Sequence, residues 1–170
     1  MADQLPKPRL VRTTHAEDGT SVFASDSLLT PFFPFGPRAT GFTILDSRPA
    51  VPVDNTAAPV SETTNVIPRC PPAGVVMVIS DLPPHYAAPM HRTVSLDYAV
   101  VLSGEIVLRL DGGEEKAVGA GGFIVQQGVN HEWINRGPEP CRILFVMVGS
   151  EKVVLGDGTV LEETVLGKKK

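Results

Sequence analysis

Short apolar runs separated by turn residues make up the second half of the chain. From residue 74 onward these runs cover residues 75–82, 96–102, 105–110, 122–126, 132–135 and 142–148. Tight connections around Gly104 and Gly112 join neighbouring runs, and such connections are typical of β-hairpins. Closely spaced short strands with glycine-rich turns favour a sandwich, jelly roll or barrel over an α/β fold. The pattern therefore predicts an all-β domain with few and short helices.

The first 72 residues follow a different pattern, in which prolines are frequent and apolar runs are brief. Proline at this density prevents any long helix and leaves extended chain and loops. Within this half, residues 10–14 and 21–24 flank a turn at Gly19, so they are predicted to form a hairpin. Residues 41–45 are predicted to form a further strand.

The contrast between the halves predicts one domain with three parts. Residues 1–72 form an extended segment that wraps a barrel of residues 73–150, and residues 151–170 form a C-terminal segment and tail that ends in Lys168, Lys169 and Lys170. Edge strands of a β domain invite uncontrolled pairing unless another element covers them. We therefore expect a homodimer, to which the extended segment contributes an intersubunit strand.

Composition limits the class of protein and its partners. Of the 170 residues, 42% are hydrophobic and 20% are charged, as in a folded globular domain. The formal net charge of −4 argues against a nucleic-acid partner, because nucleic-acid-binding surfaces are normally basic. No apolar run reaches the roughly 18 residues of a membrane span, and residues 1–10 lack the apolar core of a secretory signal. With only two cysteines, a cytoplasmic protein is expected.

Two segments carry the candidate chemistry. Residues 89–98 read PMHRTVSLDY, and residues 122–135 read GFIVQQGVNHEWIN. This pair resembles the two cupin motifs, of the form G-x5-H-x-H-x3,4-E-x6-G and G-x5-P-x-G-x2-H-x3-N. The chain thus resembles a small single-domain cupin of a bacterial and fungal subgroup, and the resemblance implies a double-stranded β-helix, or jelly-roll, cupin barrel. Phosphate-binding loops and a nucleophile elbow are missing from the sequence.

Agreement with the motifs is partial. The matching positions are His91, Gly104, Gly128, His131 and Asn135. At the site, Thr93 stands where the first motif has its second histidine, and Asp97 stands where it has glutamate. The departures elsewhere are His85 and Ala120 at the two opening glycines and Gln126 at the proline. The resemblance implies a divalent metal ion at the barrel mouth, bound by His91, Asp97 and His131.

The ligand types agree with that implication. Two imidazoles and a carboxylate suit a borderline divalent ion such as Zn, Fe, Mn or Ni, with open positions for water or substrate. The same set occurs in the facial triad of non-haem iron oxygenases. Asp97 is one methylene shorter than glutamate, so the alternative is a structural hydrogen bond to Arg92 or to a backbone amide. His85 either faces the mouth and completes the site or is a solvated loop residue.

The resulting hypothesis is a metal-dependent enzyme acting on a small oxygenated or carboxylated metabolite. Decarboxylation, dehydration or isomerisation would follow from Lewis-acid polarisation of a carbonyl or carboxylate, with His85, His131 and Tyr98 as catalytic candidates. Some fungal proteins of the subgroup lie in biosynthetic clusters, which implies secondary metabolism. The alternatives are a non-catalytic cupin that binds a small ligand, favoured by Thr93, and an iron-dependent dioxygenase.

Overall fold

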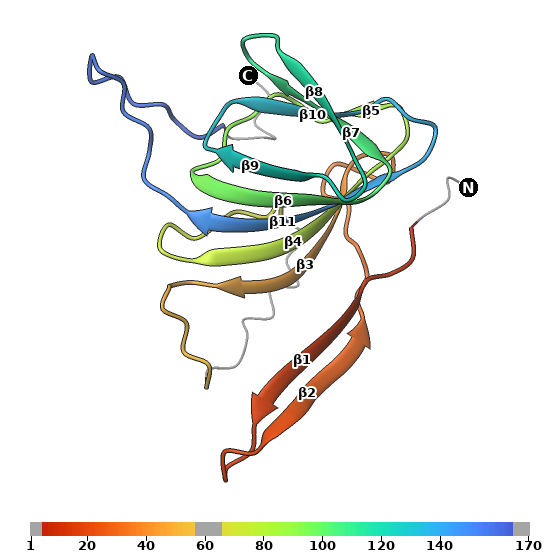
Figure 1. The fold of residues 1–170 in the computed structure, drawn as a ribbon, viewed down its shortest axis with the longest axis vertical. Coiled ribbons are helices and arrows are strands. Elements are labelled where there is room, and N and C mark those ends of the chain that lie inside the picture. Colours follow the sequence, from red (N-terminus) through yellow and green to blue (C-terminus); the bar gives the residue numbers. More distant parts are fainter. Residues whose placement is uncertain (1–4, 57–65, 165–170) are drawn as a thin grey trace.

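The structure is a computed structural model that describes residues 5–56 and 66–164, and every regular element in those ranges is a strand. The strands are β1 (Arg9–His15), β2 (Ser21–Leu28), β3 (Gly41–Arg48), β4 (Val75–Leu82), β5 (Tyr86–Ala87), β6 (Ser95–Ser103), β7 (Glu105–Leu110), β8 (Glu115–Gly119), β9 (Phe123–Gln127), β10 (His131–Asn135) and β11 (Cys141–Gly149). They form a hairpin of β1 and β2, a four-stranded sheet of order β5-β10-β7-β8, and a five-stranded sheet of order β3-β4-β11-β6-β9 (Figure 1). The all-β jelly roll that the sequence predicts is confirmed.

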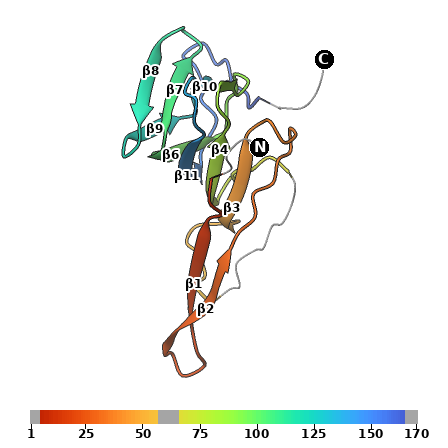
Figure 2. The same cartoon turned by 90° about the vertical axis from the view of Figure 1, so that its right-hand side faces the viewer.

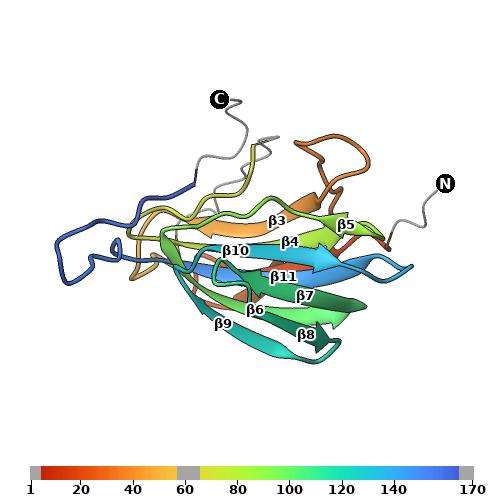
Figure 3. The same ribbon diagram turned by 90° about the horizontal axis from the view of Figure 1, so that it is seen from above.

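The two larger sheets lie against each other and enclose the core (Figure 3). Side chains along a strand point alternately to its two faces, and β3, β6 and β11 alternate buried with less buried positions accordingly. Core members come from both sheets: Val76, Val78, Leu82, Ala99, Val101, Ile106, Trp133, Cys141, Ile143, Phe145 and Met147. Burying one large apolar side chain contributes about 1.5–3 kcal/mol, so this alternation stabilises the barrel and also sets which residues face its interior.

The N-terminal half contributes a strand to the barrel instead of only wrapping it. β3 pairs antiparallel with β4 at the edge of the five-stranded sheet. The β1-β2 hairpin extends away from the barrel as a projecting arm (Figures 1 and 2). Arg12 ties this arm to the barrel through an ion pair with Asp46 at 2.7 Å. Every residue of β2 is exposed, so the arm makes few apolar contacts with its own barrel.

Two strands were not predicted from the apolar pattern, namely β5 and β8. The sequence of β8, EKAVG, has no alternation that would mark a strand. It forms because β7 offers a hydrogen-bonding edge, and because Arg109 and Glu115 stand opposite each other and form an ion pair at 2.6 Å. Cross-strand pairs of opposite charge stabilise a sheet in this way.

The segment after β11 returns to the barrel mouth. The N–H of Thr164 donates to the carbonyl oxygen of Arg92 at 3.0 Å, and the N–H of Arg92 donates to Oγ1 of Thr164 at 3.0 Å. Residues 150–164 therefore end beside His91, the neighbour of Arg92. The predicted lysine tail, residues 168–170, lies outside the described residues. In the part of the chain that the structure describes, no helix is long and apolar enough to cross a bilayer.

Candidate metal centre and its cavity

His91 and His131 are brought together by a backbone bridge between two segments. The N–H of His91 donates to the carbonyl oxygen of His131 at 2.8 Å, and the N–H of His131 donates to that of His91 at 2.9 Å. Residues paired directly across an antiparallel ladder project their side chains to the same face. The two imidazole rings accordingly lie with centroids 4.2 Å apart and a 52° angle between their planes.

Both imidazoles have the same tautomer. Nδ1 of His91 lies 2.8 Å from the carbonyl oxygen of Pro89, and Nδ1 of His131 lies 3.0 Å from that of Val129. A carbonyl oxygen can only accept, so each neutral ring carries its proton on Nδ1 and keeps a lone pair on Nε2. Metal-binding histidines are normally fixed by a hydrogen bond of this kind. The pair is therefore prepared to donate two nitrogen lone pairs.

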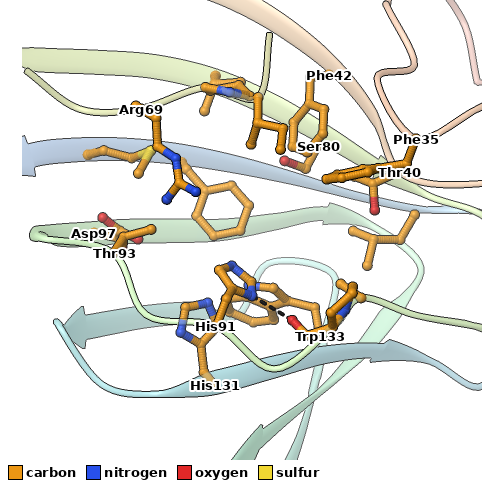
Figure 4. A pocket seen from close by; sticks show the side chains of 18 of the residues that line it. Phe35, Thr40, Phe42, Arg69, Ser80, His91, Thr93, Asp97, His131 and Trp133 are labelled. Carbon is orange, nitrogen blue, oxygen red and sulfur yellow. Dashed lines mark hydrogen bonds between the residues drawn. The ribbon is translucent and has the colours of Figure 1, made fainter. Parts of the chain in front are cut away.

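A cavity of about 90 Å³ lies between the sheets beside this pair. Its walls are mostly apolar, with Phe42, Val78, Trp133 and Phe145 among them. The polar side chains in the wall are Thr40, Arg69, Ser80, Tyr86, His91, Thr93, Asp97 and His131, all of them except Tyr86 labelled in Figure 4. An apolar cavity with a few convergent polar groups is the usual composition of a small-molecule site. The space suffices for several waters, or for the reacting end of a small metabolite.

The side-chain amide of Gln126 lies within hydrogen-bond distance of both Asp97 and His131. Asp97 is 4% exposed, and its Oδ1 accepts a hydrogen bond from the hydroxyl of Ser95 at 2.6 Å. Nε2 of Gln126 lies 3.4 Å from Oδ2 of Asp97 and 3.2 Å from Nε2 of His131. The side-chain amide of Gln126 thus lies between the two residues that the sequence predicts as ligands. The alternative partner of Asp97, Arg92, donates instead to the carbonyl oxygen of Gly128 at 3.0 Å.

The Nε2 atoms of the two imidazoles fit a divalent ion. The two Nε2 atoms carry lone pairs on one face, and Oε1 of Gln126 is a buried oxygen with no hydrogen-bond partner in the structure. Within residues 5–56 and 66–164, no three His, Cys, Asp or Glu side chains are grouped closely enough to hold a metal ion. The amide of Gln126 lies between Asp97 and His131. Metal binding by His91, Asp97 and His131 together stays a prediction.

Burial controls the ionisation of the site. Desolvation lowers the pKa of His131 to about 4, and the neighbouring His91 adds to that shift. The pKa of His91 is also lowered, mainly by desolvation and further by the charge of Arg69. Both rings are neutral at pH 7, the form that binds metal. Desolvation raises the pKa of the Asp97 carboxyl, although hydrogen bonds from Ser95 and Gln126 act in the opposite direction.

Arg69 supplies a positive charge that sequence analysis did not single out. It reaches into the cavity from the side opposite the two histidines (Figure 4). Nη1 pairs with Glu163 at 2.5 Å, and Nη2 donates to the carbonyl oxygen of Thr164 at 3.1 Å. A guanidinium carries five N–H donors, so these two contacts leave others for a carboxylate or enolate oxygen. Arg69 lies in a proline-rich loop, where no motif spacing could have marked it.

Comparison with known proteins agrees with the strand order and with the paired histidines. Residues 78–147 match the family model described as Cupin domain. The cupin-domain-containing oxidoreductase fogC of Aspergillus ruber is 34% identical over 152 residues, which cover 85% of this chain and 75% of that protein. The chain belongs to the cupin family.

Further relatives of this cupin are also fungal. The oryzines biosynthesis cluster protein J of Aspergillus oryzae is 31% identical over 167 residues, which cover 90% of this cupin and 88% of that protein. This cupin spans about half the length of other curated relatives, for example 48% of the phomopsin biosynthesis cluster protein C' of Diaporthe leptostromiformis. Among solved structures, the polyketide cyclase RemF from Streptomyces resistomycificus is 21% identical with a TM-score of 0.49, covering 72% of this cupin and 75% of the cyclase.

Two of the predicted catalytic residues lie away from the cavity of this cupin. Tyr98 is 49% exposed on the outer face of β6, because its neighbours Asp97 and Ala99 take the inward positions of the strand. His85 is exposed in the turn before β5, with a φ of 53°, and its N–H donates to the carbonyl oxygen of Gly137. Neither residue joins His91 and His131 in the cavity wall.

Trp133 belongs both to the core and to the cavity wall. It is buried in β10 and also lines the cavity. Its ring meets that of His131 edge-on, with centroids 5.4 Å apart, and that of Phe145 with centroids 5.5 Å apart. Edge-to-face contacts of this kind add to the stabilisation from burial. Trp133 thereby holds the imidazole of His131 against the barrel core.

Proposed function

We propose that this cupin is a metal-dependent enzyme that transforms a small, largely apolar metabolite with a carbonyl or carboxylate oxygen. The proposal is carried by one observation: the Nε2 lone pairs of His91 and His131 belong to the wall of an apolar cavity that Arg69 enters from the opposite side. Decarboxylation, dehydration and isomerisation are the reactions that fit such a site. Each of them begins by drawing electron density toward one oxygen of the substrate.

The residues of the cavity have distinct tasks in this proposal. His91 and His131 would hold a divalent ion, which supplies Lewis acidity toward the substrate oxygen when bound. Arg69 binds an anionic oxygen of the substrate and orients it. Phe42, Phe145 and the other apolar walls hold the carbon skeleton and exclude water. Water exclusion strengthens every electrostatic interaction within the cavity.

The names of the relatives support a role in secondary metabolism. One is described as belonging to a biosynthesis cluster and another as a cupin-domain-containing oxidoreductase. The second name favours an iron-dependent oxidative reaction as the alternative chemistry, for which two histidines and a carboxylate are a known ligand set. Thr93, in place of a motif histidine, favours a third possibility, a cupin that binds a small ligand without transforming it.

Metal content and turnover together test the proposal. The protein is purified without added metal, its bound metals are quantified by mass spectrometry, and it is incubated with a panel of small carboxylic acids and aldehydes. We expect a stoichiometric divalent ion and a product whose formation is lost in His91→Ala and His131→Ala. The matched control is His15→Ala, because His15 is exposed on β1. Unchanged metal content in both site variants would overturn the proposal.

Two further measurements separate the candidate functions. Oxygen consumption during turnover would assign the iron-dependent oxidative reaction, and its absence would assign the Lewis-acid reactions. Arg69→Gln should raise the KM for an anionic substrate tenfold or more while metal content stays unchanged. Ligand binding without any product from the panel would favour the non-catalytic alternative.

A further inference from the structure

Gln126 occupies an unusual position for a neutral side chain. It is 4% exposed, stands directly opposite Asp97 in the β6-β9 ladder, and points into the barrel. Its Nε2 lies between Nε2 of His131 and Oδ2 of Asp97, at 3.2 and 3.4 Å. Its Oε1 is buried without a hydrogen-bond partner. A buried amide that leaves its oxygen unpaired loses the free energy of that hydrogen bond, so this arrangement calls for a reason.

In its observed orientation, the amide of Gln126 faces two acceptors with its NH₂ group. Both atoms that face Gln126, Nε2 of His131 and Oδ2 of Asp97, are acceptors, and the NH₂ group donates toward both of them. Turning the amide by 180° about its last side-chain bond exchanges oxygen for nitrogen with little change of shape, since this torsion is broad and roughly two-fold. Three acceptors would then face one another, an arrangement that only a cation makes favourable.

The observed distances match those between ligands of one metal ion. For bonds of about 2.1 Å, two ligand atoms lie roughly 3.0 Å apart at a right angle and roughly 3.4 Å apart at the tetrahedral angle. The separations of 3.2 and 3.4 Å around the amide of Gln126 fall in that range. Amide oxygens are established ligands of hard divalent ions.

We propose that Gln126 is a metal ligand of this cupin, binding through Oε1 beside His91, His131 and Asp97 after its amide turns. The inference rests on the proposed function, because it concerns the same ion. Gln126 then supplies the donor that Thr93 cannot supply in place of the motif histidine. It also joins Asp97 to His131, since its amide lies between the two residues. Imidazole nitrogens with carbonyl and carboxylate oxygens favour Mn²⁺ or Fe²⁺ over ions that prefer thiolates.

Calorimetric titration of the full-length, chelator-treated protein with Mn²⁺ tests this inference, with Co²⁺ as a spectroscopic probe. We expect Gln126→Leu to weaken Mn²⁺ binding 10-fold to 100-fold and to change the visible absorption of bound Co²⁺, which reports the number and type of ligands. Gln126→Glu keeps an oxygen donor and should bind Mn²⁺ at least as tightly as the wild type. The matched control is Gln127→Leu, because Gln127 is exposed on the opposite face of β9.

The variants also separate ligation from a purely supporting role. If Gln126 only donated hydrogen bonds to His131 and Asp97, glutamate could not replace it, and Gln126→Glu would be as weak as Gln126→Leu. That result, or affinities for Gln126→Leu and wild type within twofold, would overturn the inference. His131→Ala, titrated alongside, tells the two proposals apart. If it loses the ion while Gln126→Leu does not, only the inference on Gln126 fails, and if it keeps the ion, the proposed function fails as well.

Discussion

The side chain of Asn135 donates a hydrogen bond to the carbonyl oxygen of Leu82 at 3.1 Å, across 53 residues of sequence. The same Nδ2 lies 3.0 Å from the carbonyl oxygen of Pro83 and 2.8 Å from that of Glu139. Its Oδ1 accepts from the N–H of Gly137 at 3.0 Å. The asparagine that ends the second motif thus fastens the end of β4 to the turn between β10 and β11.

Asn135→Ala should lower the free energy of unfolding by about 3 kcal/mol. The side chain is 1% exposed, and its removal leaves buried carbonyl oxygens and one N–H without partners. Glu139→Ala is the control, because it keeps the backbone carbonyl and removes only an exposed side chain, so a change within about 0.5 kcal/mol is expected. Urea unfolding of the metal-free proteins measures both. Equal stabilities of the two variants would contradict this structural role.

The stability of the metal-free protein should depend on the ionisation of His131. Its pKa in the folded state, about 4, lies below the 6.5 of an unperturbed histidine, so the unfolded state binds more protons between these values. The free energy of unfolding should therefore rise with pH from about 4 to 6.5 and then level off. The contribution of His131 is on the order of 3 kcal/mol, and the lowered pKa of His91 acts in the same direction.

Comparison with His131→Gln isolates this contribution. The raised pKa of Asp97 acts the other way, because its carboxyl is more easily protonated in the folded state and its contribution falls as pH rises through that pKa. Both proteins carry Asp97, so the difference between their profiles reports His131. Urea midpoints measured with a chelator between pH 4 and 8 provide the test. Parallel profiles would show that His131 is not buried as a neutral ring.

Asp97→Asn should separate metal ligation from hydrogen bonding. Metal affinity should fall at least tenfold, because the variant loses an anionic oxygen. The free energy of unfolding of the metal-free protein should change by less than about 1 kcal/mol, since losing a buried charge offsets weaker hydrogen bonds with Ser95 and Gln126. Calorimetric titration and urea unfolding measure the two quantities. Unchanged metal affinity with a large loss of stability would assign Asp97 a structural role.

Short apolar runs and the turn residues between them were enough to predict most of the barrel. The strands that bury one face, such as β4 and β11, carry that information in their own residues, and residues 75–82 were predicted with the bounds of β4. β8 was missed because it depends on its partner β7 and on one cross-strand ion pair. The hairpin was predicted, but not its direction, because direction depends on contacts outside the hairpin.

The motif positions were enough to predict the part of the candidate site that contains His91 and His131. The resemblance to the two cupin motifs pairs His91 with His131, and in the structure they form one antiparallel bridge. Gln126 was treated as a departure outside the site, because its approach to Asp97 depends on the β6-β9 register, which the sequence does not state. Tyr98 was predicted as an aromatic wall of a substrate pocket, but it lies on the outer face of β6, because adjacent residues of a strand face opposite ways and Asp97 faces inward.

Tyr98→Phe and His85→Ala should leave turnover and metal content unchanged. Tyr98 lies on the outer face of β6 and His85 lies in an exposed turn, so neither can reach a substrate held beside His131. The comparison variant is Trp133→Phe, which alters the ring that contacts His131 and should reduce turnover. Steady-state rates on the substrate identified from the panel measure all three. A tenfold loss in either of the first two variants would place that residue in the reaction after all.

The projecting hairpin predicts a homodimer in solution. Large apolar side chains are exposed both on this arm and on the outer face of the five-stranded sheet: Val11, Val22, Phe23, Leu28, Tyr98, Leu102, Phe123 and Val125. An aromatic side chain can bury about 150–250 Å², so this set can supply most of the roughly 800 Å² that each partner of a standard interface buries. A two-fold symmetric dimer would place the arm of each copy on the sheet of the other and cover both surfaces at once.

Light scattering over a wide concentration range should therefore give the mass of a dimer. The double variant Phe23→Ser and Leu28→Ser should shift the protein toward monomer, because these side chains are 78% and 64% exposed in the single chain and contribute apolar area only if a second copy covers them. Ser25→Ala, on the same strand, is the matched control and should remain dimeric. A monomer mass for the wild type at every concentration would contradict the prediction, and so would an unchanged dimer in the double variant.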